Sequence, residues 1–181
     1  MARAAYEEAV RLDPLFAEAH NWLGNVHSCV GRRREAIACF SKAIEIDPNC
    51  AQAYAWRGDS YLSSGRNEAA LSDYGKALSL APEDTAALNN RACAYRRSHK
   101  YDLAIADLDR LIALKPAVAH TYLFRGMCHE QDGDKSAARR DYETAIRMEH
   151  ERQGGGNGDI EREARKRLEA LGGPQQGHCA P

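Results

Sequence analysis

The sequence predicts an all-α solenoid built from antiparallel helix pairs, with about 4.5 copies of one helical unit and a C-terminal capping helix. Three observations support this fold class. Prolines recur every 34 residues, small residues recur at fixed places between them, and each interval holds two stretches with helical apolar periodicity. The prolines are Pro14, Pro48, Pro82 and Pro116. A repeat of this length usually builds a binding surface.

Each repeat is numbered so that its proline occupies position 32, which gives repeats at residues 17–50, 51–84, 85–118 and 119–152. Position 20 is always alanine. Position 8 is always small, and its residues are Gly24, Gly58, Ala92 and Gly126. Position 24 is always large, and its residues are Phe40, Tyr74, Leu108 and Tyr142. A small residue beside a large one allows two helix backbones to approach closely.

A turn splits each repeat into two helices, which in the first repeat cover roughly residues 17–30 and 33–46. Position 15, at this turn, is glycine in three repeats and His99 in the third. Glycine readily adopts the left-handed conformation that ends a helix, so histidine is the costlier choice. The proline then stops the second helix. Each repeat is therefore predicted to be a helix A, helix B hairpin.

Several of these residues resemble the tetratricopeptide repeat (TPR) family over residues 1 to about 150. They are the Trp-Leu-Gly of residues 22–24, the Ala-Ile of residues 36–37, the large residue at position 24, the alanine at position 27 and the proline at position 32. The resemblance implies a right-handed TPR superhelix, in which positions 2, 5, 6, 9, 12 and 13 of the A helices line a concave groove. It specifies an architecture rather than one activity.

The two ends of the chain depart from the repeat. Residues 1–16 match only a helix B, so this half repeat is either a short cap or the ragged end of a longer solenoid, and we favour the second interpretation. Residues 153–158 are predicted to be a Gly-rich linker, 159–171 a capping helix and 172–181 a disordered tail. An alternative is that the helix at 159–171 docks into the groove and competes with ligand.

The composition excludes several classes of function. A net charge of −1 gives no basic bias toward nucleic acid, and 44% apolar residues suit one repetitive domain. The longest apolar run is far too short to cross a membrane, and the N-terminus lacks a secretory signal, so we predict no membrane insertion and a cytoplasmic location.

No catalytic, cofactor or metal site is predicted. The 6 cysteines are scattered over different faces without a C-x-x-C motif, which is typical of reduced thiols rather than of disulfides or metal ligands. No residues depart from the repeat pattern to place a nucleophile beside an acid or a base. The chain is therefore predicted not to be an enzyme.

Positions 7 and 23 vary together. Position 7 is arginine and position 23 is aspartate in the last three repeats, whereas the first repeat has Leu23 and Cys39. This covariation predicts ion pairs from helix A to helix B within a repeat. The pairs are Arg57 with Asp73, Arg91 with Asp107, and Arg125 with Asp141.

The groove positions hold a row of aromatic residues with amides beside them. Trp22, Trp56 and Phe124 share position 6, and exposed rings in a row suit peptide anchoring. Asparagine amides can bond the backbone of an extended peptide. The predicted groove residues are Asn21, Trp22, Asn25, Trp56, Asp59, Asn89, Asn90, Cys93, Arg97, Phe124 and Met127. The alternative is that the rings pack sideways against neighbouring helices.

Two further patterns concern partners. Chaperone-binding TPR proteins hold a C-terminal carboxylate with lysine and arginine in the groove, but each possible frame here keeps one asparagine and no cation, so we predict no such clamp. A basic edge at the A-to-B turns is either solvated or binds an acidic partner; it comprises Arg32, Arg33, Arg34, Arg66, Arg97, Lys100 and Lys135.

The resulting prediction is a scaffold or adaptor that binds an extended peptide or partner segment in the groove. The alternative is a fragment that serves as the partner-selecting TPR arm of a larger enzyme or co-chaperone. In both cases the ligand is a protein or peptide.

Overall fold

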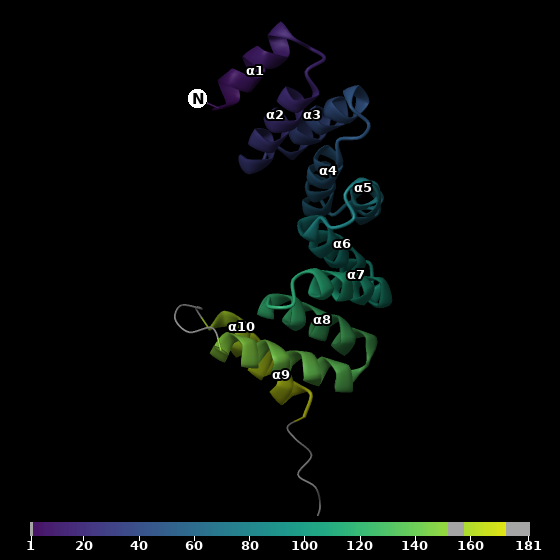
Figure 1. Cartoon of the computed structure of the whole chain (residues 1–181), viewed down its shortest axis with the longest axis vertical. Coiled ribbons are helices and arrows are strands. Elements are labelled where there is room, and N and C mark those ends of the chain that lie inside the picture. Colours follow the sequence, from purple (N-terminus) through teal and green to yellow (C-terminus); the bar gives the residue numbers. More distant parts are fainter. Residues whose placement is uncertain (1, 152–157, 173–181) are drawn as a thin grey trace, which may run out of the picture. The chain divides into compact units, whose positions relative to one another are not determined.

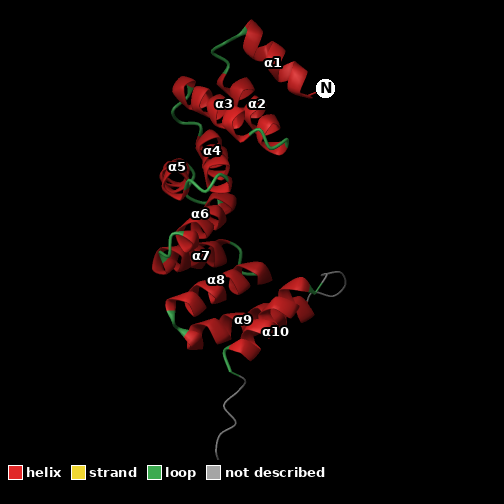
Figure 2. Cartoon of the chain, turned by 180° about the vertical axis from the view of Figure 1, so that it is seen from behind, coloured by secondary structure: helices red, strands yellow, loops and turns green. Residues whose placement is uncertain are grey.

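A computed structural model describes residues 2–151 and 158–172 of the chain, and every regular element within them is an α-helix (Figures 1 and 2). The all-α solenoid of helix pairs is thus confirmed. Residues 153–157 of the predicted linker and 173–181 of the predicted tail lie outside the described residues. The chain forms two compact units, residues 1–99 and 100–181, and their boundary falls inside the third predicted repeat.

Unit 1 begins with a single helix, continues as two helix pairs and ends with a further single helix. Its elements are α1 (Ala2–Leu12), α2 (Ala17–Cys29), α3 (Arg33–Ile46), α4 (Ala51–Ser63), α5 (Asn67–Leu80) and α6 (Thr85–Arg97). Each helix packs against the next one along the chain, and α2 and α4 also touch α4 and α6, respectively. Short loops join them in Figure 2. This packing places the A helices α2, α4 and α6 side by side.

Unit 2 has the same organisation. Its elements are α7 (Tyr101–Leu114), α8 (Ala119–Asp132), α9 (Lys135–Glu151) and α10 (Asp159–Ala170). Helix α10 packs mainly on α9 and also touches α8. The fully buried Ala164 of α10 joins a core around Tyr142, against which Leu168 and Leu171 also pack. Helix α10, which falls within the predicted capping helix at 159–171, thus packs on the last helix pair.

The small and large residues meet as the sequence predicts in the first, second and fourth repeats. The rings of Tyr74 and Tyr142 are fully buried. A Cβ atom added to Gly58 would lie 2.9 Å from Tyr74, and one added to Gly126 would lie 2.6 Å from Tyr142. Glycine at position 8 is thus required in the repeats where an aromatic ring of helix B lies this close to helix A.

The turn between helices A and B uses the left-handed conformation. Gly65 has φ of 75°, and His99, which replaces glycine at the same position, has φ of 56°. Asparagine, aspartate and histidine are the side chains that enter this region most readily, although at some cost. No described helix is long and apolar enough to cross a bilayer.

Candidate functional site

A hollow of about 380 Å³ opens between α4 and α6 of unit 1. Six of its lining residues occupy positions 2, 5, 6 and 9 of the second repeat and positions 2 and 6 of the third, which are groove positions in TPR proteins. The others come from the N-termini of the two helices and from the α5–α6 loop. The lining residues are Ala51, Gln52, Ala55, Trp56, Asp59, Ala81, Asp84, Ala86, Ala87 and Asn90.

The tryptophans form an aromatic row along the A helices of unit 1. The rings of Trp22 and Trp56 meet edge to face with their centroids 5.3 Å apart. Trp22 also stacks on Tyr6 of α1, with an interplanar angle of 12°, and Trp56 leans on Phe40 of α3. Both tryptophans remain partly exposed. These contacts fix the rings in place, while their remaining surface stays available to a ligand.

Asp59 lines the hollow and is held by two neutral donors. The Tyr74 hydroxyl donates to Asp59 Oδ1 at 2.6 Å, and Asn90 Nδ2 donates to the same oxygen at 2.8 Å. Burial raises the pKa of the Asp59 carboxyl, the two hydrogen bonds oppose this effect, and Asp84 adds a smaller rise. An ionised Asp59 is therefore costly in the free protein.

The predicted groove asparagines lie in different surroundings. Asn21 is only 2% exposed and donates to Gln52 Oε1 at 3.1 Å, so its amide faces the next helix rather than an open groove. Asn25 accepts from the Cys29 thiol. Asn89 and Asn90 are partly exposed and bonded to each other. Asn90 joins the hollow, and through Asp59 it links α6 to α4.

The remaining predicted groove residues divide between the units. In unit 1, Cys93 is a partly buried free thiol, and the exposed Arg97 donates to the Leu62 carbonyl at the end of α4 at 3.0 Å. In unit 2, Phe124 is 7% exposed and Met127 packs against the core around Tyr142. The row of exposed rings expected at position 6 therefore comprises Trp22 and Trp56, but not Phe124.

In unit 1 the position-7 arginine binds the position-23 aspartate of its own repeat. Arg57 donates from Nε and Nη2 to the two carboxylate oxygens of Asp73, each at 2.8 Å. Its third nitrogen, Nη1, donates to Ser41 of the preceding repeat at 3.0 Å. The guanidinium also lies 5.7 Å from the ring centroid of Tyr54 and 5.8 Å from that of Tyr61. It thus ties three helices together.

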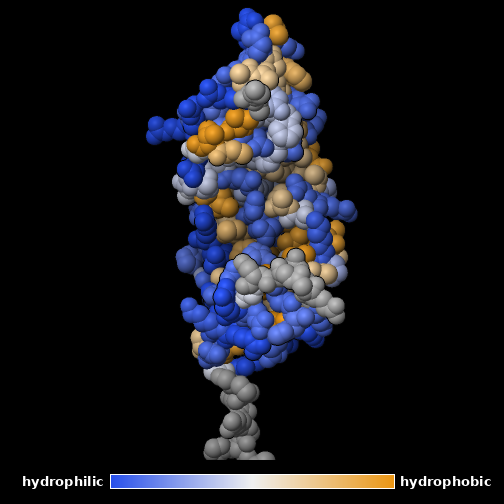
Figure 3. All heavy atoms as spheres, turned by 90° about the vertical axis from the view of Figure 1, so that its left-hand side faces the viewer, coloured by the Kyte–Doolittle hydropathy of each residue, from blue (hydrophilic) through white to orange (hydrophobic). Residues whose placement is uncertain are grey.

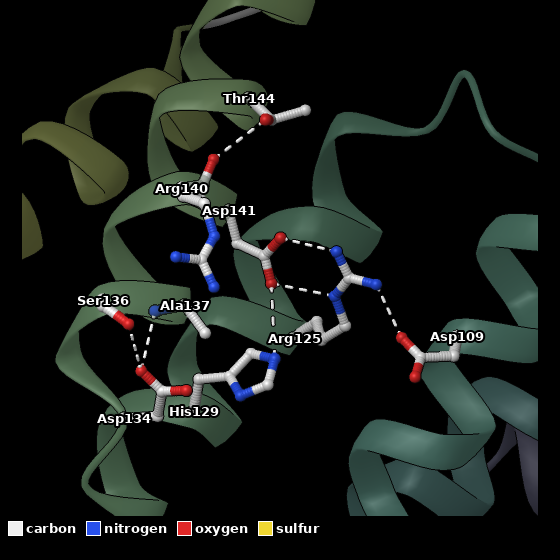
Figure 4. Close-up of polar contacts among 9 residues, drawn as sticks. All are labelled: Asp109, Arg125, His129, Asp134, Ser136, Ala137, Arg140, Asp141 and Thr144. Carbon is white, nitrogen blue, oxygen red and sulfur yellow. Dashed lines mark hydrogen bonds and ion pairs between the residues drawn. The ribbon is translucent and has the colours of Figure 1, made fainter.

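The equivalent cluster of unit 2 is more highly charged (Figure 4). Arg125 donates to both oxygens of Asp141, at 2.8 and 2.6 Å, and its Nη1 donates to Asp109 of the preceding repeat at 2.6 Å. His129 Nε2 lies 3.9 Å from Asp141. The hydrogen bond to Asp141 is the main reason why the pKa of Arg125 is raised. The third predicted pair, Arg91 with Asp107, spans the two units and stays a prediction.

Sequence reasoning missed the residues that complete these clusters. Tyr6 belongs to the aromatic row, and its signal was the large residue of the half repeat. Position 25, which supplies Ser41 and Asp109, varies too much among the repeats to stand out. The bond from Tyr74 to Asp59 joins positions 24 and 9, which only the packed hairpin brings together.

Over the face shown in Figure 3, hydrophobic residues form separate patches among hydrophilic ones. Partly exposed rings beside amides and a carboxylate are groups that can anchor and orient a ligand. The described residues contain no group of three or more histidine, cysteine, aspartate or glutamate side chains that could hold a metal ion.

Profiles of the tetratricopeptide repeat match residues 2–27, 17–50, 51–84 and 91–169. Together these ranges cover most of the chain. No curated protein sequence gives a significant match.

Solved structures show the same fold. The chain matches the crystal structure of MamA with a TM-score of 0.79 and 23% identity, over 82% of this chain and 87% of that one. A tetratricopeptide repeat protein from Parabacteroides merdae matches with a TM-score of 0.79 and 23% identity, over 93% and 65%. The first TPR of Spaghetti (RPAP3), bound to the HSP90 peptide SRMEEVD, matches with a TM-score of 0.61 and 24% identity, over 63% and 90%.

Proposed function

The chain belongs to the tetratricopeptide repeat family, and we propose that its unit 1 binds an extended segment of a partner protein along the A helices α2, α4 and α6. Helical repeats of this kind serve as protein-interaction scaffolds. The hollow lined by Trp56, Asp59 and Asn90 is the observation that carries the proposal. A structure of the same fold is bound to a peptide, which supports this mode of binding.

The polar groups of the hollow suit a peptide backbone. Asp59 Oδ2 and the second hydrogen of Asn90 Nδ2 take part in no hydrogen bond among the described residues. One can accept a backbone N–H and the other can donate to a backbone carbonyl. Trp22 and Trp56 are already immobilised by their ring contacts, so less side-chain entropy is lost when a ligand packs on them.

The test is selection of peptides from a random library against the full chain, followed by calorimetric titration of each selected peptide. Trp56→Ala is expected to weaken binding by about 2 kcal/mol, or roughly thirtyfold in Kd, as for a central aromatic anchor. The matched control is Leu103→Ala, which removes an exposed apolar side chain from α7. Circular dichroism must show that both variants fold.

A second readout uses intrinsic fluorescence. Trp22 and Trp56 are the 2 tryptophans of the chain, so a peptide bound on unit 1 should shift or quench the emission. Equal affinities of wild type and Trp56→Ala for every selected peptide would contradict the proposal.

A further inference from the structure

The charge of Asp59 is not balanced by any described residue. Its two hydrogen-bond donors, Tyr74 and Asn90, are both neutral. No ion pair joins Asp59 to a described lysine, arginine or histidine. Because both donors bind Oδ1, the other carboxylate oxygen is the one that can face a ligand in the hollow.

A matched case in unit 2 shows how such a carboxylate can be neutralised within the chain. Glu130 accepts from the hydroxyl of Tyr142 at 2.5 Å, as Asp59 does from Tyr74. Glu130 also pairs with Arg167 of α10 at 2.8 Å. In unit 2 the next helix, α10, supplies Arg167 to the carboxylate of Glu130. In unit 1 the next helix, α6, supplies the neutral Asn90 to the carboxylate of Asp59.

The rest of the lining strengthens this imbalance. Its charged members are two carboxylates, Asp59 and Asp84, and it includes no lysine, arginine or histidine. Asp84 uses Oδ1 to cap α6, where it accepts from the backbone N–H groups of Ala86 and Ala87. Asp84 also contributes to raising the pKa of Asp59, so the two negative charges sense each other.

We propose that this hollow binds a cationic side chain, a lysine or arginine of the partner segment, which pairs with Asp59 and lies against the ring of Trp56. The inference rests on the proposed peptide-binding function of unit 1. Trp56 and Asp59 are three residues apart on α4 and line the same hollow, so one cation can reach both. A cation over a tryptophan face gains further attraction.

The size of the hollow fits this ligand. Its volume of about 380 Å³ lies near the lower end of the roughly 300–1,000 Å³ of sites for small molecules. A single long side chain with apolar methylenes suits such a space, because the methylenes contact the alanines of the lining while the charged end reaches Asp59.

The test is a double-mutant cycle between protein and peptide on the full chain. Peptides selected against the wild type are resynthesised with each lysine or arginine changed to glutamine, one at a time. Loss of the anchoring cation should weaken binding to wild type about ten- to hundredfold, the range for a charge-assisted hydrogen bond. The same peptide change should have little effect on Asp59→Asn, whose side-chain oxygen can still accept from Tyr74.

Two controls separate the possible results. Asp102→Asn removes an exposed carboxylate of α7 and should retain the full preference for the cationic peptide. Peptides that need Trp56 but bind equally well after every cation is replaced would overturn this inference and leave the proposed function intact. Peptides that bind equally to Trp56→Ala would overturn both. A cation preference that persists in Asp59→Asn would also overturn the inference.

Discussion

The helices α4–α6 of unit 1 and α8–α10 of unit 2 carry the same repeat pattern but use it differently. At position 6, Trp56 stays partly exposed beside an open hollow, whereas Phe124 is buried. At position 9, α4 has the carboxylate of Asp59, while Met127 of α8 packs against the core that includes Ala164 of α10. A groove position thus stays partly exposed or packs against the core depending on its own side chain and on the helix that follows.

The polar networks of the two stretches differ in charge balance. The Asp59 carboxylate, bound by Tyr74 and Asn90, has no cationic partner among the described residues, whereas the Glu130 carboxylate, bound by Tyr142, pairs with Arg167, which also binds Glu163. The second network secures the cap within the protein. The carboxylate of Asp59 has only neutral partners, so a positive charge beside it would have to come from a ligand. For this reason we propose that recognition takes place in unit 1.

The largest effect is expected from breaking the arginine clusters. Arg125→Met should lower the free energy of unfolding by about 3 kcal/mol, because the buried Asp141 then has no arginine partner. Arg57→Met should cost less, since Arg57 pairs with one carboxylate and a hydroxyl, whereas Arg125 pairs with two carboxylates. Urea unfolding midpoints measure both.

The control for this prediction replaces both partners. Arg125→Met combined with Asp141→Leu should recover part of the loss, because no uncompensated buried charge remains. If the single and double variants unfolded at the same urea concentration, the ion pair would not be what Arg125 contributes.

The fold class followed from the sequence because the repeat imposes the same packing on each hairpin. Position 8, position 24 and the turn glycine are determined by neighbours inside one repeat, so their periodicity is visible in the sequence. The candidate site depends on contacts between repeats, which vary. The hydrogen bond from Asn90 to Asp59 and the burial of Phe124 and Asn21 arise from individual neighbours and leave no periodic signal.

The second effect compares glycines of the two stretches. Gly126→Ala should destabilise the protein by about 1–3 kcal/mol, because its Cβ would meet Tyr142 at 2.6 Å and the Cβ of Asp141 at 3.2 Å. Gly58→Ala should cost less, since its closest contact is 2.9 Å from Tyr74. Gly75→Ala in α5 is the control. It has nothing within 4 Å and should stabilise the helix by about 0.5–1 kcal/mol.

The third effect concerns the charge that distinguishes the two networks. Arg167→Met should release α10, with a loss of about 1 kcal/mol, because Glu130 keeps only the bond from Tyr142 and Glu163 loses its i,i+4 partner within α10. Hydrogen exchange of the α10 amides should become faster. Lys166→Met, at the exposed neighbouring position, should leave this exchange unchanged, and similar exchange in both variants would show that the ion pair does not hold the cap.

The smallest effect is the pH dependence that Asp59 imposes on stability. The pKa of Asp59 in the folded state lies above that of an ordinary aspartate, chiefly because of burial. Between these two pKa values the folded state therefore binds more protons than the unfolded state. The contribution of Asp59 to the free energy of unfolding must therefore fall as pH rises from the ordinary pKa through the raised one.

The variant Asp59→Asn cannot ionise and so avoids this loss of stability. Relative to wild type it should gain stability across this pH range and keep a constant advantage above it. Urea midpoints of both proteins between pH 3 and pH 7 measure the difference, in which the contributions of other carboxylates cancel. A difference that does not change with pH would mean that Asp59 is not held at a cost, and it would remove the energetic reason for a cation to bind there.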